Sequence, residues 1–139
     1  HITDEMKMQL SDFYGNYASE EETAEEIAQV YRECGYVMDT HTAVASKVCR
    51  KYREETKDTT PVVIASTASP YKFARAVVCA IEPEMAEKTD SELIDELQKL
   101  SGVRIPEAIE DIRKAPILHN TFIAGDGMEK EVASWLGLS

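Results

Sequence analysis

The feature that most constrains this fold is one short run of β-branched, apolar residues in an otherwise helical pattern. Residues 62–65 do not alternate with polar residues, which is typical of a strand buried on both faces. We predict a short buried strand at about 62–66. Such a strand needs hydrogen-bonding neighbours on both sides, and the chain offers no second convincing strand. We therefore expect an α/β fragment, predominantly helical around this strand, whose partner strands lie in sequence not present here or in a second copy.

Helical signals cover most of the remaining sequence. Ser19 and Glu22 form a capping-box pattern, and Gly35 is placed to end the helix that follows. Asp39 or Thr40 can cap the next helix. The expected helices cover residues 3–14, 20–34, 40–55, 70–82 and 90–101, with a short helix from Pro106 and a last helix from about residue 128. In the last two helices we expect the inward-facing residues to be Ile109, Ile112, Val132, Trp135 and Leu136.

Net charge and cysteine content narrow the function class. The chain of 139 residues carries a net charge of −11, which disfavours binding to nucleic acid. Cys34, Cys49 and Cys79 are odd in number, widely spaced and at apolar helix positions, so we expect buried free thiols and no metal site. Free thiols favour the cytoplasm.

The overall organisation is expected to be simple. We expect residues 1–139 to form a single unit, with His1 as the remnant of a tag or of an excised piece. We expect neither a secretory leader nor a membrane span, since no run approaches the roughly 18 apolar residues that a span requires.

The candidate site follows the predicted strand, where open α/β sheets bind small molecules. Ser66 and Thr67 either satisfy the backbone of the turn or face a ligand, and Thr67 could hydrogen-bond a ring nitrogen. Ser69 is placed to cap the next helix. Lys72, in the first turn of that helix, is unfavourable for the helix dipole and indicates either an anionic ligand or a solvated lysine. His41, at the start of a helix, is either a surface histidine or an acid–base residue.

Two segments together resemble a known family. They are GYVMDTHTAV at residues 35–44 and VVIASTASPYKF at residues 62–73. They are similar to the C-terminal part of bacterial and fungal threonine synthase, where a Gly-Tyr-x-x-Asp-Pro-His-x-Ala-Val segment precedes a strand ending in Thr-Ala-His/Ser-Pro-x-Lys-Phe. Thr40 stands where the family usually has proline. The resemblance covers most of the chain.

The resemblance implies a fold and a reaction. The fold is the C-terminal part of the tryptophan-synthase-β-like fold of enzymes that use pyridoxal 5'-phosphate. The reaction, in threonine biosynthesis, converts O-phospho-L-homoserine and water to L-threonine and phosphate. By this resemblance Thr67 faces the pyridine nitrogen of the cofactor, with Ser66 and Ser69 beside it. Lys72 and His41 are candidate substrate contacts or supporting residues.

The resemblance also implies that this chain is incomplete as an enzyme. The Schiff-base lysine and the glycine-rich phosphate loop of the family are absent from the sequence. We therefore expect no catalytic residue here, no bound cofactor, and no activity of the chain alone. Its expected partners are the remainder of the same polypeptide, the substrate of the whole enzyme, and further copies of the fragment. The alternatives are another pyridoxal-phosphate lyase of the same fold and a non-catalytic acidic helical interaction module.

Overall fold

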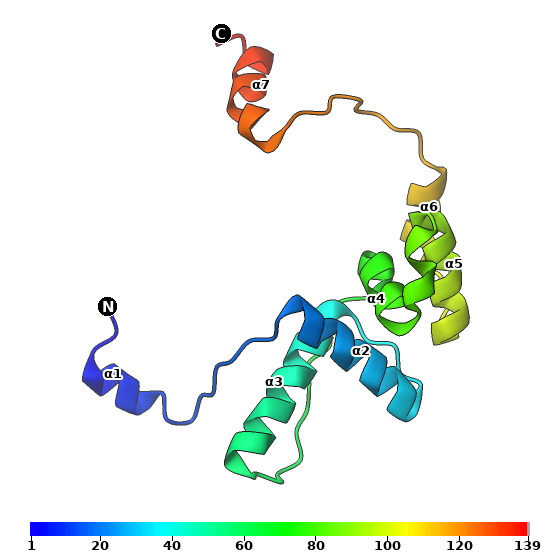
Figure 1. Ribbon diagram of the computed structural model, residues 1–139. Coiled ribbons are helices and arrows are strands. Elements are labelled where there is room, and N and C mark those ends of the chain that lie inside the picture. The colour runs from blue at the N-terminus through cyan, green and yellow to red at the C-terminus, as the bar shows by residue number, and fades with distance from the viewer. Residues whose placement is uncertain (139) are drawn as a thin grey trace.

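Four helices pack against one another to form the core of the computed structural model, which describes residues 1–138 (Figure 1). They are α2 (Glu20–Cys34), α3 (Thr40–Thr56), α4 (Ala74–Ile81) and α5 (Asp90–Ser101). Helix α2 contacts both α3 and α4, and α4 in turn contacts α5. The core is thus built on three helix pairs.

Apolar side chains from all four helices meet at the centre of this group. Burial of each large side chain contributes roughly 1.5–3 kcal/mol of transfer free energy, so these contacts dominate the stability of the core. The link between α2 and α3 and the segment after α5 add further apolar side chains. The buried cluster consists of Ile27, Val37, Met38, Ala43, Tyr71, Ala74, Val77, Val78, Leu93, Leu97 and Ile105.

The ends of the core helices match the sequence prediction closely. Ser19 and Thr89 each form a capping box with the glutamate three residues later, before α2 and α5 respectively. Asp39, not Thr40, caps α3. The helices α2 and α5 end at Gly35 and Gly102, with φ angles of 71° and 65°. These are left-handed conformations that favour glycine.

The helix after the candidate site begins with a turn that is wound more tightly than the predicted α-helix. Ser69 caps it and Pro70 is its first residue, as expected. Its first turn, η1 (Pro70–Phe73), is a 3₁₀ helix, and α4 follows directly. The short 3₁₀ helix η2 (Pro83–Glu87) then joins α4 to α5.

A buried glutamate joins α2 to α3. The Glu26 side chain is fully buried, and its Oε1 accepts a hydrogen bond from Ser46 Oγ at 2.6 Å and one from Arg50 Nε at 2.7 Å. Arg50 also reaches Glu33 through Nη2 at 3.0 Å. The pKa of the Arg50 guanidinium is raised, chiefly by its hydrogen bond to Glu26. One arginine therefore neutralises the buried charge and ties two turns of α2 to α3.

The N-terminal segment lies along α3 with its own side chains exposed. Helix α1 (Asp4–Gln9) is shorter than the predicted helix over 3–14, and none of its residues is buried. The chain then runs without helix to Ser19. The Tyr14 hydroxyl donates to Glu55 Oε2 at 2.7 Å, and Lys51 Nζ donates to the carbonyl oxygen of Tyr17 at 2.9 Å. Polar contacts hold this segment to the core.

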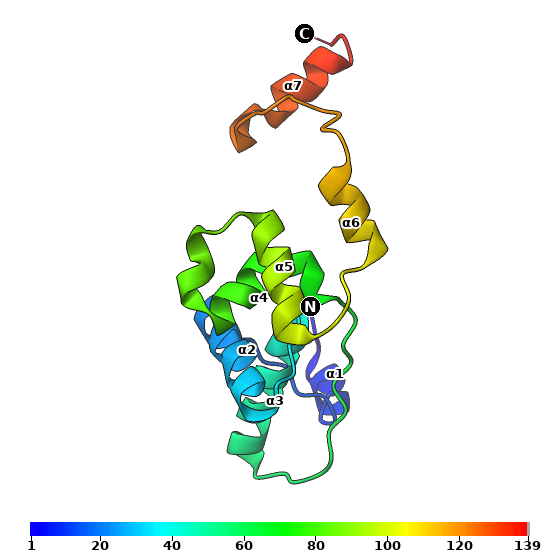
Figure 2. The ribbon, with the colours of Figure 1, turned by 90° about the vertical axis from the view of Figure 1, so that its right-hand side faces the viewer.

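The C-terminal helices extend away from the core, as Figures 1 and 2 show. Helix α6 (Glu107–Lys114) is held to α5 by Arg113, which bonds Asp95 at 2.9 Å. Residues 115–124 are an exposed linker without helix, followed by η3 (Gly125–Gly127) and α7 (Met128–Trp135).

The predicted inward faces of these two helices are wrong for most residues. Ile109 is half-buried, but Ile112 is 70% exposed and Trp135 is 69% exposed. Val132 and Leu136 are exposed as well. The amphipathic patterns are present, but only Ile109 packs against the core cluster, and the other four side chains are exposed.

The predicted buried strand at 62–66 does not form. These residues are exposed and extended, Val63 is 95% exposed, and the structure contains no strand within residues 1–138. The physical reason is that the backbone of residues 62–66 has no neighbouring strand to pair with. The described part of the chain is helical, and the α/β expectation fails on this point.

The three cysteines are free thiols, as predicted, but contrary to the prediction they are not buried. Cys34, Cys49 and Cys79 are all free thiols, but Cys34 is exposed and the other two are only half-buried. Cys34 is the last residue of α2, where the helix leaves the core. Among the described residues, no helix combines the length and apolarity that crossing a membrane requires.

Candidate functional site

The two sequence segments that carry the candidate residues meet at the start of α3. Asp39 is 1% exposed and caps the helix with one of its carboxylate oxygens. Its Oδ1 accepts the backbone N–H groups of His41 at 2.9 Å and of Thr42 at 3.2 Å. Its Oδ2 accepts the hydroxyl of Thr42. The carboxylate is therefore fully engaged by the first turn of α3.

The hydroxyl of Thr42 continues this network to the candidate turn. Its Oγ1 lies 2.9 Å from the Oγ of Ser66, at hydrogen-bond distance. Asp39, Thr42 and Ser66 thus form one hydrogen-bonded chain across 27 positions of sequence, from the helix cap to the residue before Thr67. It fixes the candidate turn to the helical core.

The charge of Asp39 is maintained inside the protein. Burial by itself raises the pKa of this carboxyl. The hydrogen bonds from the Thr42 hydroxyl and from the two backbone N–H groups lower the pKa by more, so the net pKa lies below its ordinary value. Asp39 is consequently an anion at neutral pH, and it serves as an acceptor only.

Thr67 lies next to this anchor and is exposed. No hydrogen bond from its side chain to another residue within 1–138 is present, whereas Ser69 Oγ accepts the N–H of Tyr71 at 3.3 Å. Residues 59–69 contain no carboxylate, and that of Asp39 is buried. A turn that offers neutral hydroxyls and no available acid fits a pyridine nitrogen that stays unprotonated, so the donor set is compatible with pyridoxal phosphate.

His41 and Lys72 both lie beside Phe73. The His41 ring is exposed, with its centroid 5.0 Å from that of Phe73 and its Nδ1 3.6 Å from Asp39 Oδ1. It lines a cavity of about 340 Å³ beside Glu20. Lys72 is exposed and lines a cavity of about 540 Å³ together with Arg75. Phe73 lines both cavities, so His41 and Lys72 lie near one another but line separate cavities.

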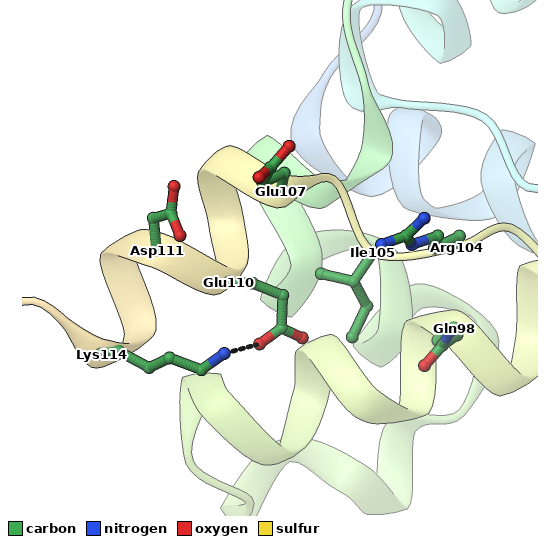
Figure 3. Close-up of a pocket in the computed structure, with 7 residues that line it drawn as sticks. All are labelled: Gln98, Arg104, Ile105, Glu107, Glu110, Asp111 and Lys114. Carbon is green, nitrogen blue, oxygen red and sulfur yellow. Dashed lines mark ion pairs between the residues drawn. The ribbon is translucent and has the colours of Figure 1, made fainter.

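A further cavity lies between α5 and α6 (Figure 3). Its volume is about 440 Å³, and its lining is mostly charged. Within it, Lys114 Nζ pairs with Glu110 Oε2 at 3.5 Å. No residue of this cavity was predicted to be functional, and Thr67, Lys72 and His41 do not line it. Its side chains come from α5, from the link between the two helices and from α6.

Comparison with known families identifies the chain. Residues 42–123 match the sequence profile described as "Threonine synthase, C-terminal", and this match covers more than half of the chain. The chain belongs to the threonine synthase C-terminal family. The match begins at Thr42 and includes Ser66, Thr67, Ser69 and Lys72. The resemblance predicted from residues 35–44 and 62–73 is thereby confirmed.

Individual relatives agree with this family. "Threonine synthase-like 1" from Homo sapiens is 39% identical over 80 residues, covering 58% of this chain and 10% of the relative. "Threonine synthase" from Pseudomonas aeruginosa is 42% identical over 59 residues, covering 42% of this chain and 12% of the relative. "Threonine synthase" from Schizosaccharomyces pombe is 38% identical over 71 residues, covering 50% of this chain and 14% of the relative.

The chain thus spans between about a tenth and a seventh of the length of these threonine synthase relatives. No solved structure matches it.

The connection from Asp39 through Thr42 to Ser66 is the feature of the site that the sequence did not reveal. The sequence predicts Asp39 as a helix cap, in alternative to Thr40, and as part of the family-like segment 35–44, and it predicts no role for Thr42 itself. Their spacing carried a local signal, because a hydroxyl residue three positions after an acidic cap can return to it. Nothing in that signal pointed to Ser66, which lies 24 positions further along the chain.

Proposed function

We propose that this chain is the C-terminal region of a threonine synthase, which converts O-phospho-L-homoserine and water to L-threonine and phosphate. The family match over residues 42–123 carries the proposal. The exposure of Thr67 at a turn anchored by Ser66 supports it. The chain would supply the wall of the cofactor site that faces the pyridine ring.

Each candidate residue has a distinct task in this proposal. Bound pyridoxal phosphate supplies an electron sink for the reaction. The Thr67 hydroxyl donates a hydrogen bond to the ring nitrogen and adds no charge there. Lys72 is an exposed cation at a cavity, and it is suited to a phosphate or carboxylate group of the substrate. His41 supports the aromatic ring of Phe73 between the two cavities.

Activity of the full-length polypeptide tests this function. We expect release of phosphate and threonine from O-phospho-L-homoserine. Thr67→Val, which removes the hydroxyl and preserves the shape, should lower kcat by roughly 10-fold or more, and Thr67→Ser should restore most of it. Ser134→Ala, an exposed change in α7, serves as the matched control. Full activity of Thr67→Val would remove Thr67 from the site.

A second candidate is another pyridoxal-phosphate lyase of the same fold. It is favoured by one observation, since the first relatives are named threonine synthase-like and not threonine synthase. A panel of O-phosphorylated and unphosphorylated hydroxy-amino acids separates the two. Turnover of a different member of the panel would select the second candidate. Absence of both turnover and cofactor binding would favour a non-catalytic acidic module.

We also propose that the chain by itself is inactive and binds no cofactor, because the lysine and phosphate-loop motifs of the family are absent from its sequence. Incubation with pyridoxal phosphate, followed by borohydride and mass spectrometry, tests this. We expect only sparse, scattered labelling of lysines. A stoichiometric adduct at one lysine would contradict the proposal. The three free thiols suit a reducing compartment, and we place the protein in the cytoplasm.

A further inference from the structure

The hydrogen-bonded chain at the candidate site has a direction. An ionised carboxylate only accepts hydrogen bonds, and a threonine hydroxyl has a single proton to donate. The proton of Thr42 is directed at Asp39 Oδ2. The contact of 2.9 Å between Thr42 and Ser66 therefore requires that Ser66 donate its proton to Thr42. Both hydroxyl protons in this chain point inward, toward the buried charge.

This direction decides what the turn can offer a ligand. With its proton committed to Thr42, Ser66 presents only lone pairs outward. An unprotonated ring nitrogen is an acceptor, so it needs a donor and is repelled by lone pairs. Ser69 is half-buried at the start of the helix of Pro70–Phe73, and its oxygen caps that helix. Thr67 is the exposed hydroxyl of this turn whose proton has no partner within residues 1–138.

We propose that Asp39 is a positioning residue that acts through Thr42 to hold the Ser66 proton inward, so that Thr67 is the donor to the ring nitrogen. Asp39 would not touch the cofactor. This inference rests on the proposed function, because it concerns the same cofactor site. It assigns a role to a buried residue that otherwise serves only to begin a helix.

The Asp39→Asn variant reverses the direction of the chain while preserving the cap. Asparagine is as good a cap as aspartate, since its side-chain oxygen can still accept the N–H groups of His41 and Thr42. Its amide nitrogen is a donor, so Thr42 must accept from it and must turn its own proton toward Ser66. The Ser66 proton is then released outward and competes with Thr67.

The experiment uses the full-length polypeptide loaded with pyridoxal phosphate labelled with ¹⁵N in the ring, and it reads the ¹⁵N chemical shift. Thr67→Val should move the shift toward that of a nitrogen without a hydrogen bond, and Ser66→Ala, which loosens the turn but removes no donor to the ring, should move it by less. Asp39→Asn should also change the shift. Adding Ser66→Ala to Asp39→Asn should return the shift to the value of Ser66→Ala alone. If Asp39 acted only by stabilising the fold, removing the Ser66 hydroxyl would not reverse the effect of Asp39→Asn.

Three outcomes separate the hypotheses. The pattern above supports the inference. If the cofactor binds and Ser66→Ala moves the shift as Thr67→Val does, or if Asp39→Asn leaves it unmoved, the inference is wrong and the proposed function stands. If the wild-type polypeptide binds no pyridoxal phosphate, the proposed function fails and the inference fails with it. Ser134→Ala should match the wild type throughout.

Discussion

At the scale of single residues, two buried carboxylates show how this protein keeps charge in its interior. Asp39 is satisfied by the first turn of its own helix, whereas Glu26 depends on Ser46 and Arg50 from the neighbouring helix. Charged groups are rarely buried without such partners, because desolvation is costly. The sequence predicted the first arrangement only in part, since a cap is a local pattern that pointed to Asp39 or Thr40. It did not predict the second, because that pairing depends on how α2 and α3 dock.

The depressed pKa of Asp39 predicts a pH-dependent contribution to stability. The contribution should be fully present above about pH 4, the ordinary range for aspartate, and should be lost as pH falls through the lower pKa of the folded protein. Asp39→Asn removes this titration. The difference in the free energy of unfolding between wild type and variant should therefore shrink as pH falls. Urea unfolding at neutral pH and at about pH 3 measures it, and a difference that stays constant would contradict the assignment.

At the scale of helices and loops, the accuracy of the sequence prediction depended on how local the signal was. The cap at Ser19, the cap at Asp39 or Thr40 and the helix end at Gly35 are determined by the chain within a few residues, and the structure confirms them with Asp39 as the cap. The apolar patterns of residues 62–66 and of α7 predict burial, and burial requires a partner from elsewhere in the fold. They failed because neither segment is enclosed within residues 1–138: the apolar side chains of α7 are exposed, and Val62 and Ile64 border α3 while remaining partly exposed.

The left-handed helix end at Gly35 gives a prediction with a matched control. Gly35→Ala puts a side chain at a φ of 71°, which should cost about 1 kcal/mol of unfolding free energy even though a Cβ would meet nothing within 4 Å. Gly15→Ala is also uncrowded and does not have this positive φ, so it should change stability by no more than about 0.5 kcal/mol. Chemical denaturation of the three proteins gives both values. Equal effects would show that backbone conformation does not set the cost.

At the scale of the whole molecule, the packed part and the extended parts of the chain differ sharply in what they bury. The core between Glu20 and Ile105 contains all of the buried apolar residues, while large apolar side chains on both flanking segments are exposed. Phe122 is 89% exposed and Leu118 is 79% exposed. Stability should therefore reside in the core alone.

Substitutions in the two regions test this division. Leu93 is fully buried, so Leu93→Ala should lower the free energy of unfolding by about 2–5 kcal/mol. Trp135→Ala removes a larger side chain that is 69% exposed, and it should change stability by less than about 0.5 kcal/mol. Unfolding monitored by far-ultraviolet circular dichroism compares them. A large loss from Trp135→Ala would mean that α7 packs in solution.

The exposed apolar segments also predict self-association of the isolated chain. Large exposed apolar surface and an unpaired extended segment both promote association. Sedimentation velocity should show a mass that rises with concentration. Val63→Lys, at a side chain that is 95% exposed, should reduce this without changing the helical content. A clean monomer at high concentration would count against the prediction.

The order in which the helices contact one another bears on how such a chain is made in the cell. Two of the three core pairs, α2 with α3 and α4 with α5, join helices that follow one another along the chain. Contacts of short sequence separation form quickly, because little loop entropy is lost before they are made. The helical hairpins should thus assemble while synthesis is under way. The extended segment between them would still be open to a partner when the ribosome releases the chain.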